Sequence, residues 1–536
     1  MMKPALLLVS LLTVGVWAQT PGVNRPRSPQ DFINVEGPDL PSRLSAAIRQ
    51  GSSQRGRFWA AYTFAVKPGV AFDVMLTGSG GSVTVFNSRT LGSPMELQNQ
   101  AAFLLYESGR NAPVRAEIYN LDRPRDYAGY PVYWLGRVDG EESLSFLRSL
   151  VDSMPNQSGS RVVDAIAAHD ESRVPAVLRD VIRAAKGIQS RTAAVSWLGR
   201  WPDQAEFLAT LVRDERELAA IRREAAEAIG ESPDAPPLPL LQELYRSVTH
   251  REVKRELLET ISDDRFEGAS LAFLIETAER EADRDLRGTA IEALGERTDT
   301  VSLQALEKAA NNAGAGVELQ QTAVEAISER VDSEAVPLLK KIARSHPRRD
   351  VRQEALDKLG ERPDQLPFLL EIVNDRGESI ELRRNAIEAV AQTESSDAMP
   401  ALKRLLDSLN NRELKEEVIE RIADSGDRPG AITFLIGIAQ NHGDAEVRKS
   451  AVEALGDMND ERAIDALSKA YDSTRDEATK NEILDALSDA DSPRALQKLM
   501  AVAQRDSSVK LRKRAIELLG ESDDPVAVKF LEQLIK

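Results

Sequence analysis

The sequence predicts a mainly α protein, in which an α-α superhelix of about 12 repeats follows a small antiparallel β-sandwich or roll. Two observations predict this class. A helical motif recurs every 31 to 33 residues over most of the chain. Before it, apolar residues recur at the two-residue period of strands. A repeat array has no single core, so its length of several hundred residues needs no division into ordinary globular domains.

Residues 1–18 have the features of a secretory signal peptide. Lys3 supplies the positive end, Ala5 to Val16 form an apolar run, and Val16 and Ala18 stand at the positions that specify cleavage. The run is too short to cross a bilayer as an anchor. We therefore expect cleavage after Ala18, no membrane insertion afterwards, and an exported protein of a bacterial periplasm or exterior. The alternative is that the segment is retained as an uncleaved anchor.

Residues 19–56 carry Pro21, Pro26, Pro29, Pro38 and Pro41 among serine, glutamine and glycine residues. Proline interrupts regular structure, so this composition predicts a linker. Within it, Leu44 to Ile48 are expected to form at most one short helical turn.

Residues 57–140 are expected to form the small β-domain. Phe58, Ala60 and Tyr62 alternate with the other face, and similar runs are separated by glycine and proline, which predicts about six antiparallel strands. The bulky residues are typical of a small core. The alternative is an aromatic face that binds a glycan or peptide. Its candidate residues are Tyr127, Tyr130, Tyr133 and Trp134.

The repeated motif is represented by the stretch VRKSAVEALGD, which begins at Val447. Val447, Ala451 and Leu455 fall on one stripe of a helix. Gly456 follows the last apolar residue, where a left-handed C-terminal cap favours glycine. Asp460 precedes the next apolar run and is the expected N-cap of the following helix. The motif therefore ends one helix and starts another, as in a tight helical hairpin.

The period is read from the polar residue that follows the first apolar position of the motif. Eleven copies at this regular spacing predict a solenoid of helical hairpins over residues 141–536. These residues are expected to form ion pairs between repeats with loop acids such as Asp283 and Asp444. The copies are Arg191, Arg222, Lys254, Arg287, Gln320, Arg352, Arg383, Lys415, Arg448, Lys480 and Arg512.

The motif resembles that of HEAT repeats, in particular the short bacterial type also found in phycobilisome-lyase-like proteins. The resemblance rests on cores such as VRQEALDKLG at 351–360 and LRGTAIEALG at 286–295, and it extends over about residues 160–536. It implies a curved array whose surface binds a protein, with the second helix of each repeat on the concave side.

Two rows of carboxylates run through the predicted second helices, five and nine residues after the polar position of the motif. On the concave side they would bind a basic protein partner. The alternative is that they are a solvated face, paired with neighbouring basic residues. The first row is Glu227, Glu259, Glu292, Glu325, Asp357, Glu388, Glu420, Glu453, Asp485 and Glu517, interrupted at Ser196. The second is Glu231, Asp263, Glu296, Glu329, Glu361, Asp424, Asp457, Asp489 and Glu521. The candidate partner-binding residues are those of the first row from Glu292 to Glu517.

The composition argues against several other functions. A net charge of −17 disfavours nucleic acid as a partner, and the absence of cysteine removes disulfides, thiolate metal sites and thiol catalysis. The four histidines are His169, His250, His346 and His442. None is followed by the glutamate that HEAT-fold di-iron hydroxylases carry next to their histidines. We therefore predict no catalytic residues, no metal and no cofactor.

The favoured function is a non-enzymatic, exported scaffold or adaptor that binds a protein partner along the solenoid. The first alternative is a ligand-binding module in which the aromatic β-domain binds and the solenoid serves as a spacer. The second is an enzyme of the lyase or hydroxylase kind. Because the apolar period changes near residue 140, the sequence also predicts two domains that unfold separately.

Overall fold

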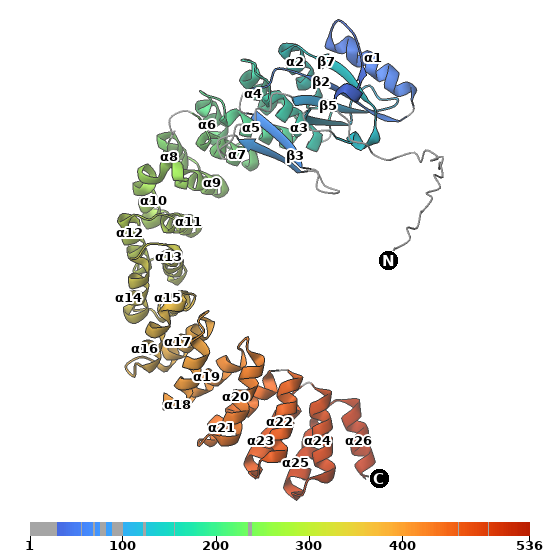
Figure 1. Cartoon of the computed structure of the whole chain (residues 1–536). Helices are drawn as coiled ribbons and strands as arrows, with labels where there is room; N and C mark the ends of the chain where they lie inside the picture. Colours follow the sequence, from blue (N-terminus) through green and yellow to red (C-terminus); the bar gives the residue numbers. More distant parts are fainter. Residues whose placement is uncertain are drawn as a thin grey trace, which may run out of the picture. The chain divides into compact units, whose positions relative to one another are not determined.

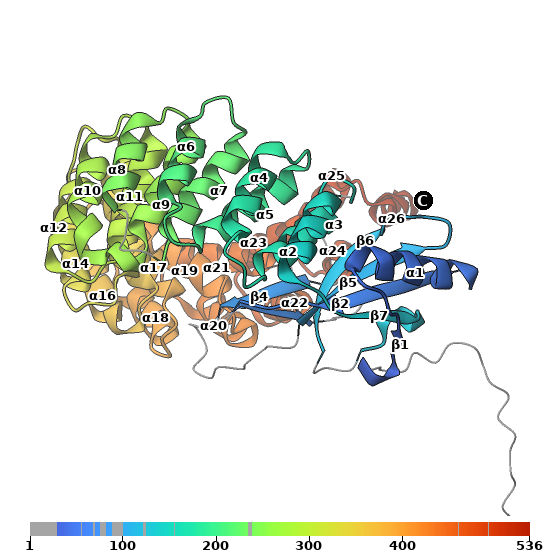
Figure 2. The ribbon, with the colours of Figure 1, turned by 90° about the horizontal axis from the view of Figure 1, so that it is seen from above.

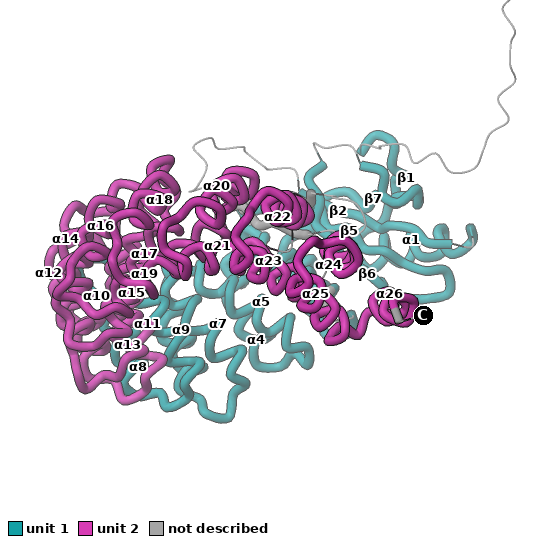
Figure 3. Tube along the Cα trace, turned by 90° about the horizontal axis from the view of Figure 1, so that it is seen from below, with its two compact units in different colours: residues 1–270 teal, residues 271–536 magenta. Residues whose placement is uncertain are grey.

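The computed structural model describes residues 29–54, 56–67, 70–75, 82–87, 100–121, 125–154, 156–233, 238–458, 460–490 and 492–535. The predicted signal peptide and the first part of the predicted linker lie outside these ranges. The chain divides into two compact units, Met1–Ser270 and Leu271–Lys536, coloured teal and magenta in Figure 3. The mainly α fold is confirmed: helices form a solenoid of repeated hairpins, preceded by a small β-sheet (Figure 1).

The β-sheet of unit 1 is mixed, where the sequence predicted an antiparallel sandwich or roll. Its order is β1-β7-β2-β5-β6, and β7 runs parallel to both β1 and β2. An alternating pattern predicts strands but carries no information about the direction of pairing, so it could not reveal this. A separate antiparallel pair contains β3 and β4. The strands are β1 Ile33–Asn34, β2 Arg57–Thr63, β3 Val70–Met75, β4 Ser82–Asn87, β5 Gln100–Glu107, β6 Arg115–Asn120 and β7 Val132–Arg137.

Helix α1, Leu40–Ser53, lies within the segment predicted to be a linker, and over the helix that prediction is wrong. Asp39 caps the helix by accepting a hydrogen bond from the Ser42 N–H at 2.8 Å. Pro41, which suggested a linker, stands in the first turn, where a helix needs no N–H donor. The buried face of α1 packs against β2 and β7 (Figure 2).

Aromatic side chains fill both faces of the sheet. On one face, Phe58 stacks on Tyr106 at 5.6 Å between ring centroids and meets Tyr133 edge-on at the same distance. On the other face, the fully buried Phe103 contacts a group of rings at 5.0–6.2 Å. That group is Phe32, Trp59, Tyr119 and Tyr127.

The sheet and the first helices of unit 1 share one core. The Ser143 hydroxyl on α2 lies 3.0 Å from the Tyr62 hydroxyl on β2 and 2.8 Å from Nε2 of His169. The His169 ring stacks on Phe64 at 3.8 Å. Backbone bonds join the same segments, from Asp170 N–H to the Ala65 carbonyl and from Lys67 N–H to that of Ala168. Residue 140 is therefore not a boundary between compact units, contrary to the expected two-domain division.

The remaining helices form hairpins in sequence order. In unit 1 they are α2 Gly140–Leu150, α3 Asn156–Ala167, α4 Val174–Ala184, α5 Ile188–Gly199, α6 Ala205–Arg213, α7 Ala219–Gly230, α8 Leu238–Ser247 and α9 Arg251–Ser262. Helix α10, Glu267–Arg280, crosses the limit between the units. In unit 2 they are α11 Arg284–Gly295, α12 Thr300–Ala310, α13 Val317–Glu329, α14 Ala335–Ser345, α15 Arg349–Gly360, α16 Leu366–Asn374, α17 Ile380–Gln392, α18 Ala398–Ser408, α19 Arg412–Ala423, α20 Arg428–Asn441, α21 Ala445–Asp457, α22 Glu461–Ser473, α23 Glu477–Asp489, α24 Pro493–Arg505, α25 Val509–Glu521 and α26 Pro525–Ile535. Short 3-10 turns are Pro29–Asp31, Tyr127–Gly129, Asp264–Phe266 and Pro363–Gln365.

The representative motif folds as a helix with the expected buried stripe, since Val447, Ala451 and Leu455 are buried in α21. Asp460 is the N-cap of α22, as predicted, and accepts a hydrogen bond from the Arg462 N–H at 2.8 Å. Among the described residues, no helix is long and apolar enough to cross a membrane.

The role predicted for Gly456 is wrong. It lies inside α21 and is not among the described glycines with positive φ, so it does not form a left-handed cap. Instead, a Cβ placed on Gly456 would lie 3.0 Å from the Ala486 carbonyl oxygen of the next second helix, α23. Gly295 and Gly360 face Ala326 and Ala389 in the same way. The recurring glycine therefore lets adjacent second helices approach closely.

The polar residue of the motif caps the first helix of its own repeat. Arg352 Nε donates to the Ala343 carbonyl at the end of α14, at 2.7 Å, and several other copies donate similarly. Arg352 also pairs with Glu378 in the next repeat at 2.5 Å. Arg448 approaches Asp476, the loop acid that precedes α23, at 3.9 Å. Ion pairs between repeats with loop acids therefore exist. Asp283 and Asp444 also cap the N-termini of α11 and α21.

Candidate functional site: the carboxylate face of the second helices

The second helices of the hairpins lie side by side within each unit. In unit 2, each odd-numbered helix from α11 to α25 packs against the next, in the order of the chain (Figure 1). In unit 1 the same holds for α3, α5, α7 and α9. Because the repeats are nearly equal in length, residues at equivalent positions of the motif recur along the stack.

The first carboxylate row lies on this stack and is largely open to solvent. Asp357, Glu388 and Asp485 are half-buried and the other members are exposed. In unit 2, the members of the second row are exposed as well. We call the carboxylates of both rows in unit 2 the acidic face. The structure therefore places all candidate partner-binding residues on consecutive second helices, with Glu292 at one end and Glu517 at the other.

Basic side chains contact part of the acidic face, as the alternative interpretation expected. Arg421 lies 4.0 Å from Glu388, 3.8 Å from Glu420 and 3.6 Å from Asp424. Arg514 contacts Asp485 at 2.7 Å. Exposed pairs of this kind contribute about 0–1 kcal/mol each, so an incoming cation can replace them at small cost.

Several carboxylates lie near Asp357 on α15. Burial, followed by the charges of Glu354 and Glu388, raises the pKa of Asp357 to about 7. Burial also raises the pKa of Glu354. Oδ1 of Asp357 is buried and receives no hydrogen bond from the described residues. A cation placed here would satisfy that oxygen and favour the ionised form of both acids.

Unit 1 contains a recess where Ser196 interrupts the first row. It measures about 480 Å³ and lies among α3, α5 and α7. The Trp197 indole N–H donates to Oδ1 of Asp164 at 2.8 Å, and burial raises the pKa of Asp164 to about 6. Burial likewise raises the pKa of Glu224. Sequence reasoning missed this recess, although the pair Ser196-Trp197 stands where most repeats have a carboxylate followed by a small residue.

Comparison with known families agrees with this geometry. Residues 271–360, 366–444 and 432–520 match a family model described as HEAT repeats. Unit 2 is built of HEAT repeats. The resemblance to HEAT repeats that was inferred from the motif is therefore confirmed for the type of repeat.

Solved structures with similar helical folds are distant in sequence. Kap121p bound to Pho4p is 13% identical, with a TM-score of 0.39 over 71% of this chain and 49% of that chain. Importin beta is 12% identical, with a TM-score of 0.32 over 72% and 64%. The complex of CpcE and CpcF of phycocyanin lyase from Nostoc is 18% identical, with a TM-score of 0.23 over 47% and 94%. The chain thus spans about half the length of the Kap121p chain that it matches. No curated protein matches the chain.

The aromatic candidates of the β-domain do not form one exposed face. Tyr127 and Tyr133 are buried, and they belong to the cores on opposite sides of the sheet. Tyr130 and Trp134 are half-buried. Trp134 packs against Phe32, on the side of Tyr127. The four residues are therefore mainly structural, because a small mixed sheet covered on both faces needs large side chains to fill its two cores.

Two of the histidines, His169 and His346, are buried in structural positions. His169 is buried in the joint between sheet and helices, and burial lowers its pKa to about 4. The buried His346 lies 3.1 Å from the Ala310 carbonyl oxygen through Nε2. Within the described ranges, no group of three or more histidine or carboxylate side chains is arranged to hold a metal ion.

Proposed function

We propose that the protein is a non-catalytic scaffold that binds a basic segment of a protein partner along the acidic face. One observation carries the proposal: successive second helices present a carboxylate at the same place, and at Asp357 burial, together with the charges of Glu354 and Glu388, raises the pKa to about 7. Lysine or arginine side chains would favour the ionised form of this carboxyl. The HEAT-repeat solenoid is the framework that holds the carboxylates in register.

The geometry of the repeats indicates the form of the partner. Packed helices lie about 8–10 Å apart, and a polyproline II segment, which is extended and has three residues per turn, advances about 3.1 Å per residue. An extended segment that follows the second helices would therefore pass one repeat for about every three residues. A basic residue at every third position would meet a carboxylate of each repeat in turn.

We propose further that the protein acts after export, because residues 1–18 have the charge, apolar run and cleavage positions of a signal peptide. N-terminal sequencing of the mature protein from its native source tests this. A mature chain that begins at Gln19 is expected, and a chain that retains Lys3 and the apolar run would contradict cleavage.

The acidic face is tested by reversing three of its charges together, Glu388→Lys, Glu420→Lys and Glu453→Lys. The probe is an unstructured peptide with lysine at every third residue, and its affinity is measured by titration calorimetry at two salt concentrations. We expect the wild type to bind more weakly at high salt, since salt screens exposed charges over about 8 Å at physiological ionic strength. The variant should lose at least tenfold in affinity.

A matched control reverses three carboxylates on first helices, Glu371→Lys, Asp407→Lys and Asp465→Lys, which changes the net charge equally. This control should keep most of the affinity. Each reversal on the acidic face should change the free energy of unfolding by about 0.5 kcal/mol or less. Unchanged binding with a lowered melting temperature would instead show that the row only supports the array. Equal losses of affinity in both variants would show that the peptide responds only to the net charge of the protein and does not bind the acidic face specifically.

A further inference from the structure

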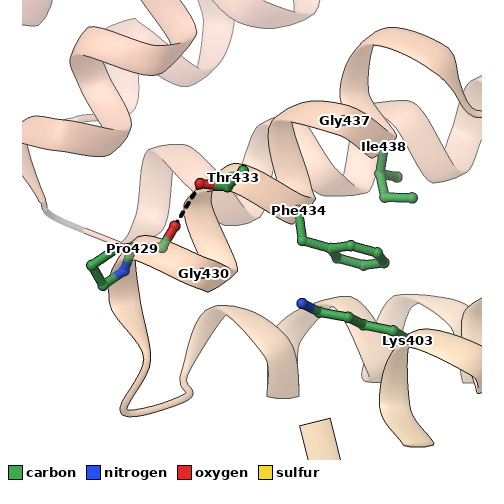
Figure 4. A pocket seen from close by; sticks show the side chains of 7 residues that line it. All are labelled: Lys403, Pro429, Gly430, Thr433, Phe434, Gly437 and Ile438. Atoms are coloured by element: carbon green, nitrogen blue, oxygen red, sulfur yellow. Dashed lines mark hydrogen bonds between the residues drawn. The ribbon is translucent and has the colours of Figure 1, made fainter. Parts of the chain in front are cut away.

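A groove on the first helices of unit 2 differs in chemistry from the acidic face. It lies between α18 and α20 and has a volume of about 620 Å³, within the range of sites that take small molecules or side chains (Figure 4). Pro429, Phe434 and Ile438 supply apolar surface, and Lys403 is the charged residue of its lining. Phe434 and Ile438 are half-buried, so part of each side chain stays exposed.

Helix α20 is unusual among its neighbours because it carries no charged residue from Pro429 to Gln440. The equivalent positions can be read from the buried leucines Leu402, Leu435, Leu467 and Leu499. Two residues after each of them stand Arg404, Gly437, Lys469 and Ala501. Two residues before Leu435 and Leu467 stand Thr433 and Asp465. Positions that carry charge in α18 and α22 are therefore uncharged in α20.

Gly437 is not explained by packing within the chain. Glycine in the middle of a helix costs about 0.5–1 kcal/mol relative to alanine. At Gly456 a close neighbouring helix accounts for that cost, but a Cβ added to Gly437 would meet no atom within 4 Å. Any side chain at this position would project into the groove, whose lining includes Gly437 (Figure 4). The glycine keeps the groove open.

Lys403 gives the groove a positive charge in a chain of net charge −17. Its ammonium lies 4.8 Å from the centroid of the Phe434 ring, in the geometry of a cation–π contact. Figure 4 shows the lysine and the ring side by side. A ligand that covers the free part of this apolar surface would bring its own polar groups next to the ammonium, where a carboxylate is favoured.

We propose that this groove docks a segment of a protein partner in which a bulky apolar side chain stands next to a carboxylate. The apolar side chain occupies the space above Gly437, against Phe434 and Ile438. The carboxylate pairs with Lys403. The groove lies on first helices and has the opposite charge to the acidic face, so this docking does not depend on the function proposed above.

The test uses the full-length protein and three labelled peptides that differ only in their central residues: glutamate-leucine-phenylalanine, lysine-leucine-phenylalanine and glutamate-serine-serine. Binding is followed by fluorescence anisotropy. We expect the first peptide to bind at least fivefold more tightly than the other two. Gly437→Arg introduces the charge that α18 carries at the equivalent position, and it should weaken binding of the first peptide at least tenfold. A glycine-to-arginine change in a helix is not expected to impair folding.

The matched control is Ala501→Arg, at the equivalent position of α24, and it should leave binding unchanged. Lys403→Glu should reverse the preference, so that the lysine peptide binds more tightly than the glutamate peptide. Equal binding to the wild type and to Gly437→Arg would overturn the proposal, and so would no binding to the wild type. Self-association that Gly437→Arg abolishes would assign the groove to a second copy of this chain, which also overturns it.

Discussion

The β-sheet of unit 1 and the repeats of unit 2 reach stability by different routes. In the sheet, strands far apart in the chain meet: β2 pairs with β5 and with β7, and aromatic rings on both faces form the contacts. In the repeats, each helix packs mainly against helices of its own and adjacent hairpins, through leucine and alanine side chains. The sheet therefore depends on a few large, shared contacts, and the repeats depend on many small, local ones.

The largest effect is expected from Phe103→Ala in the sheet. Phe103 is fully buried among four other aromatic rings, so its truncation should cost about 3–5 kcal/mol in the free energy of unfolding. Because the sheet and α2 share the contacts of Tyr62, Ser143 and His169, the loss should reach the first helices of unit 1. Hydrogen exchange measured by mass spectrometry should accelerate over residues 57–170.

Exchange over residues 300–520 serves as the internal control for that variant and should stay unchanged. Faster exchange in the sheet alone, with α2 and α3 still protected, would restore the independent unfolding of two domains that the periodicity near residue 140 suggested. Faster exchange in both units would contradict the local nature of the repeats.

The repeats were predictable from the sequence because their chemistry is local. The buried stripe of α21 and the N-cap Asp460 follow from spacings of three or four residues. Gly456 was placed at the right position but given the wrong reason, since its steric constraint comes from Ala486, thirty residues away in the next repeat. Helix α1 was missed because Pro41 is compatible with both a linker and a first helical turn.

The second prediction separates these two roles of glycine. Gly456→Val would place a branched side chain 3.0 Å from the Ala486 carbonyl and should cost about 1–3 kcal/mol through displacement of α23. Gly520 has the same place in the motif, but a Cβ there would meet nothing within 4 Å. Gly520→Val should therefore change stability by about 0.5 kcal/mol or less.

Urea unfolding and hydrogen exchange compare the two glycine variants. In Gly456→Val, exchange should accelerate over residues 440–490 and little elsewhere. If both valine variants were equally destabilised, the cause would be the backbone conformation that both glycines share. The close approach of adjacent second helices would then not explain the effect.

The third prediction concerns pH and the recess of unit 1. Burial raises the pKa of Asp164 to about 6, so the native state holds this proton more tightly than the unfolded chain, whose value is about 3.9. The protonated Asp164 carboxyl therefore contributes to the free energy of unfolding at low pH, and this contribution decreases as pH rises from about 4 to about 6. Asp164→Asn keeps an acceptor for the Trp197 indole and cannot ionise. The difference in free energy of unfolding between variant and wild type should therefore favour the variant by about 1–2 kcal/mol more at pH 7.5 than at pH 4.

His169 provides a contrast of opposite sign in the same unit. Its pKa is lowered to about 4, so protonation of the unfolded chain below about pH 6.5 destabilises the native state. The Asp164→Asn variant should leave this acid-side loss intact. Thermal melts at several pH values, with wild type and variant compared at each, isolate the aspartate. An equal effect of the substitution at pH 4 and pH 7.5 would contradict the raised pKa.

The candidate site was predictable only in part, for a related reason. The carboxylate rows follow from the period, and the structure places them on consecutive helices as expected. The charge of Asp357 depends on Glu354 from its own helix and on Glu388 from the next, together with its burial, and a linear pattern does not report burial. The burial of Tyr127 and Tyr133 agrees with the core interpretation, but their proximity in sequence could not show that they lie on opposite faces of a sheet.

The smallest expected effect is the pH dependence of basic-peptide binding at Asp357. With a pKa of about 7, this carboxyl is partly protonated in the free protein at neutral pH, and a bound lysine would favour its ionised form. Binding should therefore release a proton, and the affinity for the lysine-containing peptide should rise a few-fold between pH 6 and pH 8. Asp357→Asn should remove most of this rise while lowering the affinity only slightly, since neighbouring carboxylates of the acidic face remain.

Glu453→Gln, which removes one exposed carboxylate of the same row, should keep the pH dependence. Calorimetry in two buffers of different ionisation enthalpy measures the released proton directly, and no proton release by the wild type would show that the peptide does not reach the crowded carboxylates on α15.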